Sequence, residues 1–120
     1  WQARWNSPAN GDDEGVRLDP LVLTGQPIRL YVTGATTGVQ GERRVVTLKY
    51  DTIAQGGNKD PLWSPVPIRL RPGDVHSEPA GIDVHWIPGT PTRHFNIGGR
   101  SLSPTSGWDW QTLGYTDNTP

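Results

Sequence analysis

Two histidines in the second half of the sequence are spaced so that they could act together. Gly81–Gly98 contains two runs of strand-forming residues around Pro88-Gly89-Thr90-Pro91, which is a typical turn sequence. Counting outward from this turn places His85 opposite His94 in an antiparallel hairpin. Because opposed residues in such a pair have Cβ atoms about 5 Å apart, both imidazoles could reach one metal ion.

Asp83 falls on the same face of this predicted hairpin as the two histidines. Two imidazoles and a carboxylate can bind a divalent metal and leave a position open for water. One hypothesis is therefore a metal-dependent enzyme built on Asp83, His85 and His94, with His76 as a further ligand if the chain folds back. The other is a polar face that meets solvent or a neighbouring subunit. We favour the second, because no further His or Cys follows at ligand spacing.

Trp108 and Trp110 form the second candidate site. They flank Asp109, so they point to the same side of an extended strand. A flat aromatic pair beside a carboxylate can stack on a sugar ring, and a carbohydrate-binding module would use this pair with Trp63. The pair suits a protein partner equally well, since Trp is enriched at interface hot spots. The competing interpretation is burial in the core, because Trp covers a large apolar area.

The N-terminal residues add a third set of candidate contacts. Residues 1–15 show no sustained hydrophobic period, so we expect an arm or loop there. Trp1 and Trp5 lie in this arm, and exposed apolar side chains of that size usually mark an interaction surface. We therefore predict that both dock onto this domain or onto a neighbouring one.

Composition and periodicity predict one all-β domain. The chain has 120 residues, only 32% of them hydrophobic, with 15 Gly and 12 Pro. Such a chain favours short strands joined by turns, in an antiparallel β-sandwich or small jelly-roll-like domain over residues 16–115, followed by a tail at 116–120. The predicted strands are 16–23, 27–33, 43–50, the two arms of the hairpin at 81–98, and 108–115.

Two details of this fold can be checked directly. Within 43–50 we expect Val46, Leu48 and Tyr50 to face inward, and we expect loops at 34–42 and 101–107 because Gly, Thr and Ser are frequent there. The predicted hairpin has one apolar face, which we expect in the core: Ile82, Val84, Trp86, Phe95 and Ile97.

Charge and motifs narrow the function classes. A net charge of −1 argues against nucleic acid as the main partner, and no apolar run reaches the length of a membrane span. There is no Cys and no nucleophile-elbow motif. Basic residues are concentrated in 21–71 and acidic ones in the flanking parts, an arrangement that suits self-assembly.

We therefore expect a non-catalytic structural or recognition domain of a larger extracellular or virion-type assembly, homo-oligomeric or multi-subunit and without a cofactor. The alternatives are the carbohydrate-binding module and the metal-dependent enzyme.

Overall fold

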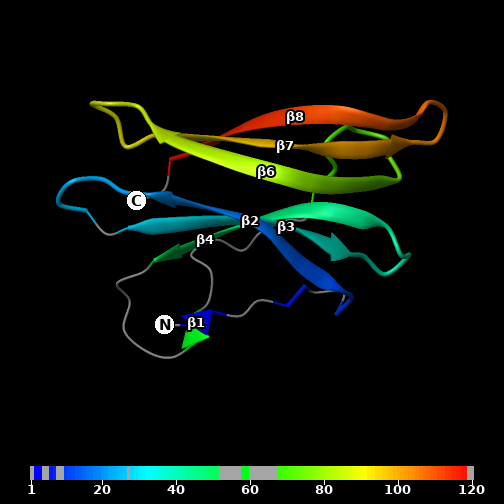
Figure 1. Cartoon of the computed structure of the whole chain (residues 1–120), viewed down its shortest axis with the longest axis horizontal. Helices are drawn as coiled ribbons and strands as arrows, with labels where there is room; N and C mark the ends of the chain where they lie inside the picture. The colour runs from blue at the N-terminus through cyan, green and yellow to red at the C-terminus, as the bar shows by residue number, and fades with distance from the viewer. Residues whose placement is uncertain are drawn as a thin grey trace.

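The computed structural model describes residues 2–3, 6–7, 10–26, 28–51, 58–59 and 68–118, the pairs 2–3 and 58–59 by their backbone alone. Two three-stranded antiparallel sheets form a small β-sandwich, and the described ranges contain no helix, which confirms the predicted all-β class (Figure 1). Accordingly, no helix in these ranges could cross a membrane. The strands are β1 (Gln2–Ala3), β2 (Asp13–Leu21), β3 (Arg29–Thr37), β4 (Arg43–Asp51), β5 (Asn58–Lys59), β6 (His76–Trp86), β7 (Arg93–Ser103) and β8 (Gly107–Asp117).

Each sheet is a meander of consecutive strands, in the orders β2-β3-β4 and β6-β7-β8. The described strands therefore form a sandwich without the Greek-key exchange of a jelly roll. β6 contacts all three strands of the other sheet, and the Asp19 carboxylate on β2 accepts a 2.6 Å hydrogen bond from the backbone N–H of Val84. β1 and β5 pair in parallel and lie on the opposite side of β2-β3-β4 from the second sheet (Figure 1).

The predicted hairpin is present with the predicted register. His85 lies opposite His94, Val84 opposite Phe95, and Trp86 opposite Arg93. The turn residue Gly89 has a φ of 81°, a backbone conformation that favours glycine. Turn and alternation together determine this pairing, because a slip of one residue would move the apolar side chains to the wrong face.

The main core lies between the two sheets. Tyr31 and Val45 from the first sheet pack with Phe95 and Ile97 from the second. Ile82, Val84, Leu113 and Tyr115 pack around them, and Leu21 and Leu70 complete the fully buried set. Of the predicted apolar face, Trp86 is the exception, because it lies at the exposed end of the hairpin and donates its indole N–H to the Thr90 carbonyl at 2.6 Å.

The prediction that Val46, Leu48 and Tyr50 of β4 face the core between the sheets is wrong. Val46, Leu48 and Tyr50 are buried, but they form a second cluster with Leu30 and Val32 on the side of the sheet away from β6-β7-β8. The residues that face the main core include Val45 and Lys49. Alternation shows which residues share a face, but this sheet buries apolar side chains on both faces, so alternation could not assign the inner one.

Two segments predicted as loops belong partly to strands. β3 continues to Thr37 and β7 to Ser103, while β2 begins at Asp13 rather than Val16. Two glycines inside these strands, Gly34 and Gly99, sit opposite bulges. A Cβ at Gly34 would collide with the backbone of Glu14, and one at Gly99 with the backbone of Glu78. Close backbone approach of this kind is a known reason for glycine inside a strand.

Candidate functional site

Trp108 and Trp110 lie side by side on the outer face of β6-β7-β8. Their exposed fractions are 45% and 77%, whereas the residues between and beside them on β8 turn inward. The prediction that both point the same way is confirmed, and the interpretation as core residues is wrong. Two large apolar side chains exposed next to each other on the face of a sheet are the feature of this molecule that most requires an explanation.

Arg100 extends this aromatic surface across to β7. Its guanidinium carbon lies 4.3 Å from the centroid of the Trp108 ring, a cation–π distance. The Glu78 Oε2 atom on β6 accepts a 2.8 Å hydrogen bond from Arg100 Nε and lies 2.7 Å from Nη2 in an ion pair, and these contacts hold the guanidinium in place. The result is a row of ordered side chains that crosses all three strands: Glu78, Arg100, Trp108 and, beside it, Trp110.

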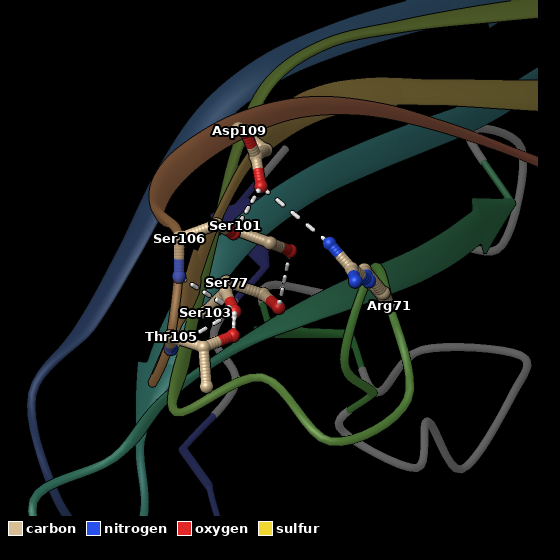
Figure 2. Close-up of polar contacts among 7 residues, drawn as sticks. All are labelled: Arg71, Ser77, Ser101, Ser103, Thr105, Ser106 and Asp109. Carbon is tan, nitrogen blue, oxygen red and sulfur yellow. Dashed lines mark hydrogen bonds and ion pairs between the residues drawn. The ribbon is translucent and has the colours of Figure 1, made fainter.

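Asp109 does not belong to this surface. It lies opposite Ser101 on the inner side of the sheet, and its Oδ2 accepts a 2.9 Å hydrogen bond from the Ser106 hydroxyl (Figure 2). The Arg71 guanidinium approaches the same oxygen at 3.5 Å. Asp109 was predicted to accept bonds from a ligand beside the tryptophans, but the alternation that exposes them turns this carboxylate to the other side of β8.

A buried serine pair supports the same end of the sheet. The hydroxyls of Ser77 and Ser101 are 3.1 Å apart, and Ser77 Oγ accepts a 2.9 Å bond from the backbone N–H of Leu70 (Figure 2). This bond fixes the segment that precedes Arg71, so Arg71 lies within reach of Asp109. The neighbouring turn is closed by the Ser103 hydroxyl, which accepts from the backbone N–H groups of Thr105 and Ser106 at 3.3 Å.

The His pair occupies the opposite end of the same outer face. The imidazoles of His85 and His94 stack with centroids 5.7 Å apart and planes only 14° from parallel, and Asp83 Oδ2 lies 3.6 Å from His85 Nδ1. Stacked rings direct their nitrogens side by side rather than toward a common point. Within the described residues, no group of three or more His, Cys, Asp or Glu is arranged to hold a metal ion.

His76, considered as a further ligand, lies at the other end of β6. Its Nδ1 accepts a 3.0 Å hydrogen bond from the backbone N–H of Arg43, which ties the ring to β4. Asp83, His85 and His94 therefore lie together, whereas His76 lies away from them. The hypothesis of a metal-dependent enzyme would now require a site made from these three alone, and stoichiometric metal analysis at neutral pH tests it.

The inner face holds a polar cluster that sequence reasoning missed. Lys49 Nζ lies 2.8 Å from Asp117 Oδ2, with side-chain exposed fractions of 0% and 1%, and the Tyr31 hydroxyl donates to the same oxygen at 2.7 Å. These groups link β3 and β4 to the end of β8, so they clamp the two sheets together. A lysine in the middle of a strong strand sequence was the available signal, but its partner is 68 residues away.

Burial controls the titration of this cluster. It raises the pKa of the Tyr31 hydroxyl, and the hydrogen bond to the Asp117 carboxylate raises it further. Burial also lowers the pKa of the Lys49 ammonium, with the attraction of Asp117 opposing that shift. Since Lys49 and Asp117 are sealed from solvent, a substrate has no access to them, and their role is to hold the sheets together.

Of the predicted contact residues, the structure brings Trp108 and Trp110 together, while Trp1, Trp5 and Trp63 lie outside the described residues. The chain matches no family model, no curated protein and no solved structure. Sequence reasoning identified the tryptophan pair but missed Arg100, because its place beside the tryptophans depends on the β7–β8 register. It missed Glu78 because a bulge between Pro79 and Gly81 shifts the β6–β7 register there.

Proposed function

We propose that the protein is a non-catalytic recognition domain of a larger extracellular or virion-type assembly, which contacts its partner through the outer face of β6-β7-β8. The observation that carries the proposal is the exposure of Trp108 and Trp110 on one face. Tryptophan and arginine dominate the binding energy of protein interfaces when they become desolvated. Here Trp108 and Arg100 are already stacked, so less side-chain entropy is lost on binding.

The shape of this face supports a macromolecular partner. Two cavities lined by described residues, of about 240 and 290 Å³, lie elsewhere, one on the outer face of β2-β3-β4 and one around Asp74 and His76. Neither is lined by a tryptophan. Small-molecule sites are usually concave, whereas two exposed aromatic side chains on the face of a sheet suit an extended or flat partner.

Sedimentation velocity over a concentration series tests this proposal. We expect the wild-type chain to associate and the double variant Trp108→Ala, Trp110→Ala to remain monomeric at the same concentrations. The control is Leu18→Ala, which removes an exposed apolar side chain from the other sheet and should leave association unchanged. A wild-type chain that stays monomeric throughout, or a double variant that associates normally, would contradict the proposal.

A second candidate is carbohydrate binding by the same tryptophans. It is favoured by the polar groups next to the two rings, since Glu78 and Arg100 lie where hydrogen bonds to sugar hydroxyls would form. A glycan array with the wild type and with Trp108→Ala and Trp110→Ala separates the candidates. Glycan binding that disappears in both variants supports the carbohydrate-binding module, and binding that survives in both would eliminate it.

A further inference from the structure

The free edges of the two sheets differ in how they are protected. β2 has Pro20 and a bulge between Gly15 and Arg17, and β6 has Pro79 and a bulge beside it. The free edge of β4 is partly covered, because Val45 and Ile68 exchange two backbone hydrogen bonds of 2.8 Å. Prolines, bulges and covering segments are common ways in which a sheet edge avoids pairing with another chain.

Strand β8 has no proline and no bulge, and no described strand covers its free edge. Its eleven residues, Gly107–Asp117, contain no Pro, Lys or Arg, and they pair with β7 without any register shift. Among the described residues, no strand pairs with the other edge of β8. In Figure 1 it forms the rim of the molecule, on the far side of its sheet from β2-β3-β4. A long, regular edge without Pro, Lys or Arg is a template for strand addition.

The burial pattern also indicates a missing neighbour. Every inward position of β7 is buried, from Arg93 to Ser103, whereas the inward positions of β8 remain partly exposed until Asp117. Leu113 and Tyr115 are among the partly exposed ones, although both pack against the core. A further strand alongside β8 would cover them.

We infer that β8 pairs antiparallel with β8 of a second copy, around a two-fold axis through Thr112. This inference rests on the proposed function: it names a second copy as the partner and places the contact at the β8 edge of the outer face, where Trp108 and Trp110 lie. Thr112 is the midpoint of Gly107–Asp117, so this register pairs all eleven residues of each strand. An isologous contact of this type closes as a dimer, because each copy presents the same edge to the other.

The side chains are complementary in this register. Trp110 lies opposite Gly114 of the second copy, where a large aromatic ring covers a residue without a side chain, a pairing known to stabilise strand glycines. Trp108 lies opposite Thr116, and Asp109 opposite Tyr115, so no like charges face each other. The two sheets join into one of six strands, and the tryptophans of both copies share one continuous outer face.

Introducing a charge at the axis provides a sharp test, since Thr112 is exposed and, in this register, lies opposite Thr112 of the second copy. Thr112→Lys opposes two lysines and Thr112→Glu opposes two glutamates, and like charges directly opposite destabilise a strand pair. We expect each variant alone to dimerise roughly tenfold more weakly than the wild type. An equimolar mixture of the two should regain dimerisation as a heterodimer, measured by sedimentation velocity.

Thr116→Lys is the matched control. It introduces the same charge on the same face of the same strand, but opposite Trp108 rather than opposite itself, so dimerisation should be retained. Circular dichroism and urea unfolding establish that each variant is folded. Dimers of Thr112→Lys as tight as those of the wild type, or a mixture that dimerises no better than its components, would overturn the β8 register. If the tryptophan double variant still loses association, the proposed function stands and only this mode of contact fails.

Discussion

The two faces of β6-β7-β8 are built from alternate residues of the same strands, yet they have opposite properties. On the inner face, Phe95, Ile97 and Asp117 are buried and have partners within the chain. On the outer face, Trp108 and Trp110 are exposed. The comparison shows that the two-residue period of the strand separates the side chains that pack in the core from those left exposed, which we propose contact a partner.

This separation has a practical consequence. Because inner side chains bond to the other sheet, their removal should lower the free energy of unfolding in an isolated chain. Outer side chains make few contacts of that kind, so their removal should change association and leave the free energy of unfolding almost unchanged.

The largest effect is expected for Asp117→Ala. This variant removes the carboxylate that contacts the buried Lys49 ammonium and accepts from the Tyr31 hydroxyl. Breaking one member of a buried ion pair typically costs about 3–5 kcal/mol, measured by urea unfolding. Glu78→Gln is the control, because its partner Arg100 is half-exposed and exposed pairs contribute less than about 1 kcal/mol. Equal losses in the two variants would contradict the assigned roles of the two faces.

A smaller effect is expected in the apolar part of the inner face. Ile97 has no exposed surface and packs in the main core. Ile97→Val removes one buried methyl group, which typically costs about 0.5–1.5 kcal/mol. The same urea titration measures this loss. If the variant is as stable as the wild type, Ile97 is not packed as the structure describes.

Alkaline pH provides a third test. The pKa of Tyr31 is raised above its ordinary value of 10.0 in the folded chain, so above pH 10 the unfolded chain loses this proton first. Unfolding then releases a proton, and the free energy of unfolding falls as pH rises, by about 1.4 kcal/mol per pH unit for one group.

Lys49 has the opposite effect on how the free energy of unfolding changes with pH. It acts only below its ordinary pKa of 10.5, because its pKa is lowered in the folded chain. The comparison is therefore made above pH 10.5, where the unfolded state has also lost that proton. Tyr31→Phe should show a shallower fall than the wild type. Identical slopes would mean that the Tyr31 hydroxyl does not keep its proton in the folded state.

The smallest effect on stability is expected for Trp110→Ala, because its ring is mostly exposed. Surface substitutions of this kind usually change stability by less than about 0.5 kcal/mol, and urea unfolding is the measurement. A loss comparable with that of Asp117→Ala would show that the ring supports the fold.

Local patterns were sufficient to predict the register of the β6–β7 hairpin and the common direction of the two tryptophans. In both cases the relevant residues are close in sequence, so alternation and one turn determine the geometry. The Lys49–Asp117 pair, the inner position of Asp109 beside Arg71 and the bulges opposite Gly34 and Gly99 were not predicted. Each depends on how distant strands meet, and that is decided by packing of the whole sandwich.

The most direct test of the central claim is hydroxyl-radical footprinting of the wild-type chain over a concentration series, with side-chain modification measured by mass spectrometry. If the outer face is the contact surface, modification of Trp108 and Trp110 should slow as the protein associates. Val39, 85% exposed on the turn between β3 and β4, should keep a constant rate. Constant rates at both tryptophans while the protein associates would contradict the account.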